Sequence, residues 1–308
     1  MEVLLEDDWH CRRDQHYERV RPWVEARLQR TSRNKQHPID DFLFEYYANR
    51  PAKLLRWHPG LGVVLAGESA RQYLSFKEYS ETREGITAEV LQMSPQRIES
   101  VRWLHQMLRR TAERPGIFGC WGLHEWAMIY GASTLRHREW PLRVTRGEVA
   151  KVVESFGLRC THYDAFRFFT PVARPLNRWQ PTRATTASFE QPACLHANMD
   201  LYKWAFKLAP FTASELVADC FALALQIRAL DMRASPYDFT ALGYPPIPIE
   251  RPEGRAEYEA RQRQFASLAA PLRTRLTQLC EQIIERAALL DRPRRESVSE
   301  TALANDNS

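Results

Sequence analysis

Apolar residues recur at steps of three and four along most of the chain, which is the period of helices that bury one face. The pattern is clearest between Phe265 and Leu290. A second long helix is predicted to begin at Thr212, where Thr212 and Glu215 have the spacing of a capping box, and to end before Pro236. Shorter helical patterns cover residues 15–30, 39–49, 96–113, 121–130, 146–156 and 194–208.

Strand signals are few and short. They cover residues 62–66, 141–144 and 158–162. Together these patterns predict a mainly α fold, with a single multi-helix domain over residues 1–291 and minor short β-strands. Residues 292–308 are polar and hold few large apolar side chains, so we expect them to form a disordered tail.

The composition suits an ordinary globular protein and excludes fibrous and disordered classes, because 44% of the 308 residues are hydrophobic and 26% are charged. No run approaches eighteen apolar residues, and the N-terminus carries acids where a signal peptide carries bases. We therefore expect a cytoplasmic protein with no membrane partner. The six cysteines include no C-x-x-C pair, which argues against a disulfide framework and a thiolate zinc ribbon. These features leave the oligomeric state open.

Positive charge is concentrated in the middle of the chain. Residues 94–183 contain fifteen Lys or Arg and seven Asp or Glu, a net charge of +8 within a chain whose total is +5. Nearly all of it is arginine, which suits bidentate phosphate contacts and stacking. A GC-rich genome would produce the same excess of arginine over lysine. Charge alone therefore identifies no partner.

The segment from residue 159 to residue 183 mixes arginines with aromatic residues. Cations neutralise phosphates and aromatic faces accept an exposed base, so this mixture suits a nucleic-acid surface. The same aromatic side chains could instead belong to the core. The candidate DNA contacts are Arg167, Arg174, Arg178 and Arg183.

Histidines stand close to carboxylates at three places. The pairs are His124 with Glu125, His162 with Asp164, and His196 with Asp200. A spacing of two in an extended segment, or of four in a helix, places both side chains on one face. Such a pair can bind a metal ion, or the acid can orient the imidazole as in a catalytic dyad. Buried hydrogen bonds that only hold the fold would give the same pattern.

Another carboxylate, Glu45, lies one helical turn after Asp41 among aromatic residues. Desolvation by these neighbours would raise its pKa and suit it to general acid or base work. Pairing of Glu45 with an arginine such as Arg50 is the structural alternative.

Several of these segments together resemble a bacterial family commonly labelled 3-methyladenine DNA glycosylase, and the resemblance covers residues 39–275. The segments are His37–Tyr47, Trp57–Gly60, Gly122–Met128, His162–Pro171, Cys194–Trp204 and Asp231–Asp238. The resemblance implies a DNA repair N-glycosylase that excises alkylated purines from damaged DNA without a cofactor. The chain lacks a full helix-hairpin-helix element with a following catalytic Asp, and it lacks a cysteine-histidine zinc snap. No catalytic residue is therefore carried over.

A glycosylase needs a carboxylate beside the sugar, aromatic side chains around the flipped base, and arginines on the backbone. The clusters of carboxylates, aromatic residues and arginines in the sequence supply candidates for each part. The candidate catalytic residues are Glu125, Asp164, Asp200 and Glu45, and the candidate pocket aromatics are Trp121, Tyr163 and Trp204.

The alternative function is that of a metal-dependent enzyme. In this interpretation His124, His162 and His196 converge with neighbouring acids on a divalent transition metal, Fe, Zn or Mn. The protein would then be a non-haem iron oxygenase or a metallohydrolase. A third interpretation is a binding module without turnover, which would bind DNA in a salt-dependent way.

Overall fold

The computed structural model describes residues 1–135 and 137–305, and side chains as far as residue 289. Helices dominate and the strands are short, which confirms the mainly α class expected from the sequence. The helices are α1 (Glu6–Ser32), α2 (Phe42–Tyr46), α3 (Pro95–Glu113), α4 (Leu123–Ala127), α5 (Arg146–Phe156), α6 (Tyr163–Phe166), α7 (Thr186–Phe189), α8 (Leu195–Lys207), α9 (Ser214–Arg233) and α10 (Pro252–Asn305). The strands are β1 (Glu2–Leu4), β2 (Val63–Leu65), β3 (Tyr79–Thr82) and β4 (Gly85–Ala88).

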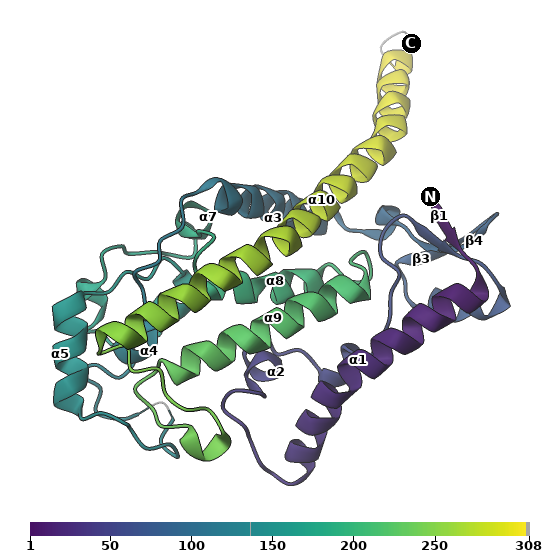
Figure 1. Ribbon diagram of the computed structural model, residues 1–308. Coiled ribbons are helices and arrows are strands. Elements are labelled where there is room, and N and C mark those ends of the chain that lie inside the picture. Colours follow the sequence, from purple (N-terminus) through teal and green to yellow (C-terminus); the bar gives the residue numbers. More distant parts are fainter. Residues whose placement is uncertain (136, 306–308) are drawn as a thin grey trace.

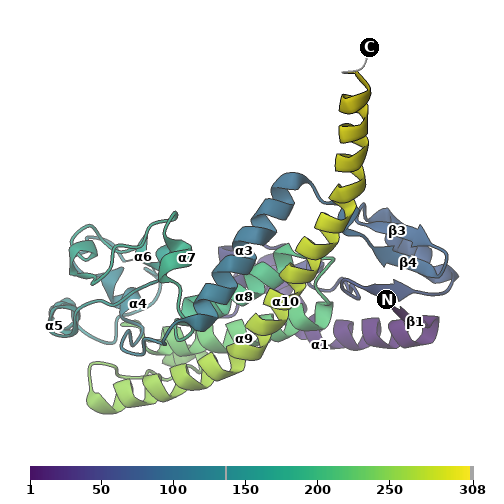
Figure 2. The same cartoon turned by 90° about the horizontal axis from the view of Figure 1, so that it is seen from above.

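The centre of the molecule is a layer of packed helices. Helices α8 and α9 lie side by side, and α10 crosses both of them and α3 (Figures 1 and 2). Helix α9 has buried side chains on nearly every face, which is typical of a helix enclosed by its neighbours. Its polar residues Arg228 and Asp231 are therefore carried into the core.

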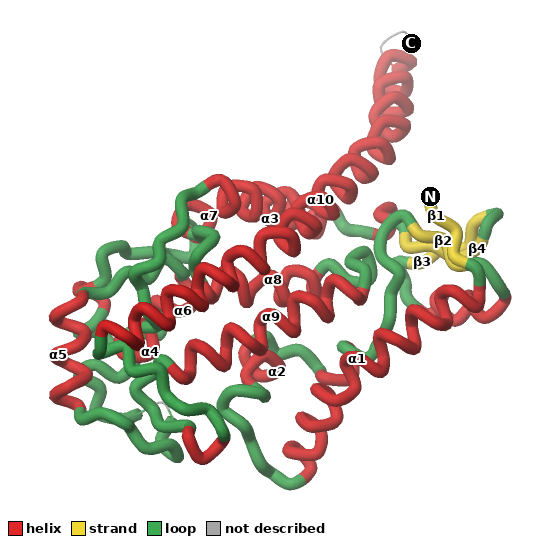
Figure 3. Tube along the Cα trace, viewed as in Figure 1, coloured by secondary structure: helices red, strands yellow, loops and turns green. Residues whose placement is uncertain are grey.

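The small sheet lies at one end of the helical layer, and α4 to α7 with their loops lie at the other (Figure 3). Its strand order is β1-β2-β4-β3, with β1 parallel to β2 and the other pairs antiparallel. Val64 and Leu65 are fully buried. The indole of Trp9 on α1 donates a hydrogen bond to the carbonyl oxygen of Ala66, which fixes the first helix to the sheet.

Several local expectations were wrong. The N-cap of α9 is Ala213, and Thr212 forms no capping box because Glu215 instead accepts hydrogen bonds from Arg12 and Trp57. Residues 141–144 and 158–162 form isolated bridges in place of strands. Three short strands were missed: β1, which pairs with the distant β2, and β3 and β4, which form a local hairpin.

The C-terminal end also differs from expectation. The structure continues α10 to Asn305, through most of the segment expected to be disordered. This segment contains no glycine and has good helix formers such as Arg294, Arg295, Glu296 and Ala302, although Pro293 within it cannot donate an intrahelical hydrogen bond. Residues 306–308 of the expected tail lie outside the described residues. Within the described chain, no helix combines the length and the apolar character needed to span a bilayer.

A buried histidine lies where the sheet meets α9. The Nδ1 atom of His58 is 3.0 Å from the hydroxyl of Tyr79, and its backbone exchanges hydrogen bonds with Ser214. Burial lowers the pKa of His58 to about 4. The folded protein therefore holds this imidazole neutral over a pH range in which the unfolded chain protonates it.

We expect this histidine to make the protein acid-sensitive. Because its pKa is lower in the folded state, its contribution to stability is complete above pH 6.5 and is lost as the pH falls toward 4. The substitution His58→Gln should flatten the dependence of the unfolding free energy on pH in that window, by on the order of 3 kcal/mol across it. Urea denaturation at a series of pH values measures this slope. Equal slopes in both proteins would contradict the assignment.

Candidate metal centre

The turn before α4 directs polar side chains into the core. Trp121 and Gly122 have φ values of 41° and 70°, in the left-handed region that is strained for a tryptophan. A Cβ atom on Gly122 would lie 3.3 Å from the Tyr258 ring, so glycine is required by space as well as by conformation. The chain thus enters α4 abruptly, and all five residues of the helix are buried, His124 and Glu125 included.

Three histidines meet at this end of the molecule. His124 comes from α4, His162 precedes α6, and His196 lies in the first turn of α8. The ring of His196 meets that of His124 edge to face at 4.4 Å between centroids, and it stacks on His162 at 5.2 Å. All three rings are buried. We call these residues the histidine cluster.

The outer two histidines are each held by a carboxylate distant in sequence. His124 Nε2 donates to Asp231 Oδ2 at 2.9 Å, and His162 Nδ1 donates to Glu190 Oε1 at 2.7 Å. Burial lowers the pKa of each imidazole, but the Asp231 and Glu190 carboxylates outweigh burial and raise both pKa values above the ordinary range.

The central histidine behaves differently. Burial, with a further contribution from the neighbouring His124, holds the pKa of His196 well below its ordinary value. Within the described chain the ring nitrogens of His196 take part in no hydrogen bond. A neutral imidazole with a free nitrogen is the form that binds a metal ion.

Three sets of side chains bring possible ligand atoms within 4.8 Å of one another. The sets are His124, His196 and Asp231; His162, Glu190 and Cys194; and His162, Asp164 and Asp200.

Two of these sets are poorly suited to a metal ion. In the set with Asp164 and Asp200, the Lys203 ammonium lies 3.4 and 2.8 Å from the two carboxylates and already balances them. In the set with Cys194, burial raises the pKa of the thiol well above its ordinary value, which disfavours the thiolate that binds metal.

The set His124, His196 and Asp231 fits an ion best. An ion bound to both atoms would replace the proton that His124 Nε2 now donates to Asp231 Oδ2. Their 2.9 Å separation is close to the ~3.0 Å separation of adjacent ligands whose bonds to a metal are about 2.1 Å long. Asp231 Oδ1 and the Tyr258 hydroxyl are buried without a hydrogen-bond partner. Unsatisfied buried polar atoms are rare, and an ion or water is a common reason for them.

A small enclosed cavity adjoins these residues. Its volume is about 20 Å³, which is enough for one water-sized species. Its walls include His124, His196 and Tyr258 together with three cysteine thiols. The cysteines are Cys120, Cys160 and Cys194, which are scattered in the sequence.

A buried arginine, Arg228, pairs with the acids next to the histidine cluster. Arg228 Nη1 lies 3.0 Å from Glu125 Oε1 and 3.9 Å from Asp231 Oδ2. Its guanidinium lies over the Phe42 ring at 3.8 Å. The cation thus joins α9 to α4 and neutralises charge next to the metal set.

Two large cavities lie on either side of the histidine cluster, and Asp164 lines both. The aromatic cavity, of about 670 Å³, is lined by His196, Glu125 and Arg228 together with aromatic side chains. Those side chains include Phe42, Tyr46, Trp140 and Phe168.

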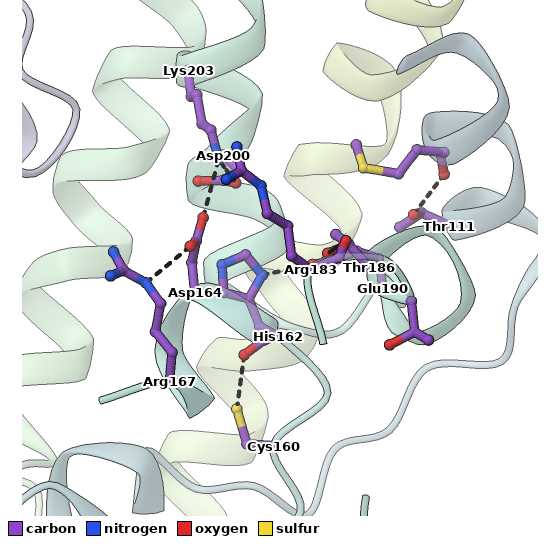
Figure 4. Close-up of polar contacts among 12 residues, drawn as sticks. Thr111, Cys160, His162, Asp164, Arg167, Arg183, Thr186, Glu190, Asp200 and Lys203 are labelled. Carbon is purple, nitrogen blue, oxygen red and sulfur yellow. Dashed lines mark hydrogen bonds and ion pairs between the residues drawn. The ribbon is translucent and has the colours of Figure 1, made fainter. Parts of the chain in front are cut away.

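The second cavity, the basic cavity, measures about 680 Å³ (Figure 4). Six of the residues predicted for a glycosylase line it: Tyr163, Asp164, Arg167, Arg183, Asp200 and Trp204. It is also lined by His162, Glu190, Trp103, Lys203, Lys207 and Arg273. Figure 4 shows Arg183 extending toward Asp200, with Asp164 between Arg167 and Lys203.

Other predicted residues lie elsewhere. Trp121 packs edge to face on Phe156 and lines neither large cavity. Glu45 lines the aromatic cavity and pairs with an arginine, as the structural alternative expected, but the partner is Arg27 at 3.1 Å in place of Arg50.

The remaining two candidate DNA contacts are outside both cavities. Arg174 donates to the carbonyl oxygen of Arg167, and Arg178 lies over the ring of Trp179.

Sequence reasoning missed several residues of the site. Asp231 stood only at the start of one segment of the family resemblance, and Arg228, Glu190 and Tyr258 were not among the predicted residues. The signal that could have found Asp231 is its place in an otherwise apolar helix, where an acid needs a buried partner.

Comparison of the chain with protein-family models, with curated proteins and with solved structures finds no match in any of the three. The functional argument therefore depends on the geometry of the site.

We expect the buried ion pair to be a major stabilising contact. Replacing Arg228 by Met removes the cation between Glu125 and Asp231 and should lower the unfolding free energy by about 3–5 kcal/mol. The control Arg71→Gln breaks an exposed pair with Glu81 and should change it by less than about 1 kcal/mol. Urea denaturation measures both. Similar small effects for the two variants would show that the buried pair contributes little.

Proposed function

We propose that the protein is a metal-dependent enzyme whose ion is held by His124, His196 and Asp231. One observation carries the proposal: two buried imidazoles and a carboxylate from three different helices meet within ligand distance, and the central imidazole is neutral with free ring nitrogens. The His196 ring lines the aromatic cavity and its nitrogens are not among the fully buried unpaired atoms, so they are open to an ion or to water from that side. Because no described protein group occupies them, they are available as metal ligands.

The ligand set indicates which ions and reactions suit the site. Two imidazoles and one carboxylate favour a divalent transition metal such as iron, zinc or manganese. Three protein ligands leave positions for substrate or water, which is the arrangement of non-haem iron oxygenases and of metallohydrolases. When bound, the ion would supply either oxygen activation or an activated water.

The protein residues around the site have distinguishable roles. In the metal-free protein Asp231 orients His124 through the 2.9 Å hydrogen bond, whose proton would leave when an ion binds, and Arg228 balances the charge of Asp231 and Glu125. His196 connects the metal set to the aromatic cavity, which has the volume of a small-molecule site. Its rings and the nearby guanidinium suit a substrate that has both an apolar part and a polar group.

The test is the metal content of purified, tag-free protein after anaerobic reconstitution with Fe(II), Zn(II) or Mn(II). We expect near-stoichiometric binding of one ion, and at least a tenfold loss in His196→Gln and Asp231→Asn because each removes a ligand. Inductively coupled plasma mass spectrometry measures the metal, and circular dichroism checks that the variants fold. The control His105→Gln changes a histidine outside the cluster and should retain the metal. A wild-type protein that binds no ion after reconstitution would overturn the proposal.

A second candidate function is the excision of alkylated purines, which the family resemblance implies. It is favoured by the six predicted residues that line the basic cavity, where two carboxylates, aromatic rings and arginines lie together. Lys203 helps to lower the pKa of Asp164 although burial opposes this. The resulting carboxylate could stabilise an oxocarbenium-like sugar. The arginines would contact the DNA backbone.

Release of 3-methyladenine from methylated duplex DNA tests this candidate. Asp164→Asn and Asp200→Asn should each lower the rate by about 100-fold or more, because each removes a carboxylate from the cavity. Asp219→Asn, an acid on α9 outside the cavity, serves as the control. Insensitivity to a chelator would separate this activity from a metal-dependent one. Wild-type rates in both cavity variants would remove the candidate.

A further inference from the structure

A buried arginine lines the basic cavity without forming a direct ion pair. Arg273 on α10 is 2% exposed and donates a hydrogen bond to the side-chain oxygen of Asn198. Within the described chain no carboxylate lies within ion-pair distance of it, although the charge of Glu190 acts on it from farther away. Burial lowers the pKa of Arg273 and Glu190 raises it, and the guanidinium stays charged. A buried, unpaired cation is unfavourable unless an anion joins it.

The acids of the basic cavity are already balanced by other groups. Lys203 contacts Asp200 at 2.8 Å and Asp164 at 3.4 Å. Asp164 also pairs with Arg167 at 3.1 Å. The remaining acid, Glu190, is bound by a histidine of the cluster.

Positive charge is therefore in excess in the cavity. Besides Arg273, the cavity is lined by Arg183 and Lys207, and neither forms an ion pair within the described residues. Arg183 and Lys207 are exposed, whereas Arg273 is buried. The three cations thus extend from the mouth of the cavity to its interior. This distribution suits a small dianion, such as a phosphate monoester, that enters from solvent.

The mouth of the cavity also offers flat apolar surface. Trp103 and Trp204 meet edge to face at 5.7 Å between centroids, and Trp103 is 41% exposed. Both rings line the cavity. An exposed indole beside surplus cations suits a ligand that carries an aromatic ring and a phosphate. The volume of about 680 Å³ is within the range of small-molecule sites.

We propose that the basic cavity binds a small aromatic phosphate monoester of the nucleoside monophosphate class. The phosphate pairs with Arg273 in the interior and with Arg183 nearer the mouth, and the aromatic ring lies against Trp103. This site is separate from the metal set and does not depend on it. A duplex is a poorer fit than a small molecule because Arg273 is buried.

Calorimetric titration of the full chain in phosphate-free buffer with a chelator tests the proposal. The probes are adenosine monophosphate, adenosine and inorganic phosphate. We expect the monophosphate to bind at least about tenfold more tightly than adenosine, and inorganic phosphate to compete with it. Arg273→Gln should weaken monophosphate binding by at least about tenfold and leave weak adenosine binding unchanged. Arg275→Gln, an exposed arginine on the same helix, should bind as the wild type does.

Arg183→Gln gives a second test that does not disturb the core, because Arg183 is exposed. It should weaken monophosphate binding several-fold. If Arg273→Gln does not fold, wild-type affinity in Arg183→Gln overturns the proposal. Equal affinity of the wild type for adenosine and its monophosphate also overturns it, as does binding of duplex DNA that the monophosphate cannot displace. Because a chelator is present throughout, failure here leaves the metal-dependent function unaffected.

Discussion

The buried contact between Arg228 and the carboxylates of Glu125 and Asp231 is the constraint on which the site depends. It joins the short α4 to the central α9 and fixes Asp231, which in turn orients His124. Without a buried cation, two acids and an imidazole would not share an apolar interior. The strained turn at Trp121 is held in the same region, because the helix that follows is anchored by this contact. The strained backbone at Trp121 is thus held in place by ion pairs between residues far apart in the sequence.

The sequence predicted the helical class because the periodicity of α3, α5, α8 and α9 depends on local patterning alone. It failed for short strands, both the distant partner β1 and the local hairpin of β3 and β4. Strands β1 and β2 are about sixty residues apart, and β1 has only three residues, too few to show alternation. The expected capping role of Thr212 failed for a similar reason. Glu215 finds stronger partners in Arg12 and Trp57 than a backbone N–H would provide.

In the candidate site, too, the sequence predicted residues that stand out among their neighbours and missed contacts between residues far apart in the chain. The sequence singled out His124, His162 and His196 because each stands near an acid, and the structure brings the three together. The acids that bind the outer two are Asp231 and Glu190, neither of which is the neighbour in sequence. For His124 the reason is geometric, because adjacent helical residues point about 100° apart and Glu125 faces away from the ring. For His162 the extended segment ends at this residue and Asp164 lies inside α6, so the spacing of two no longer places both side chains on one face. A buried side chain therefore finds its hydrogen-bond partner on another helix or loop that packs against its own.

Helix α10 contributes Tyr258 to the small cavity and Arg273 to the basic cavity, and it covers α3, α8 and α9. It follows every other described element along the chain. The histidines and Asp231 are therefore synthesised before the helix that encloses them, and the apolar faces beneath α10 stay uncovered until it has emerged. The core of this protein is expected to close only after α10 has been added.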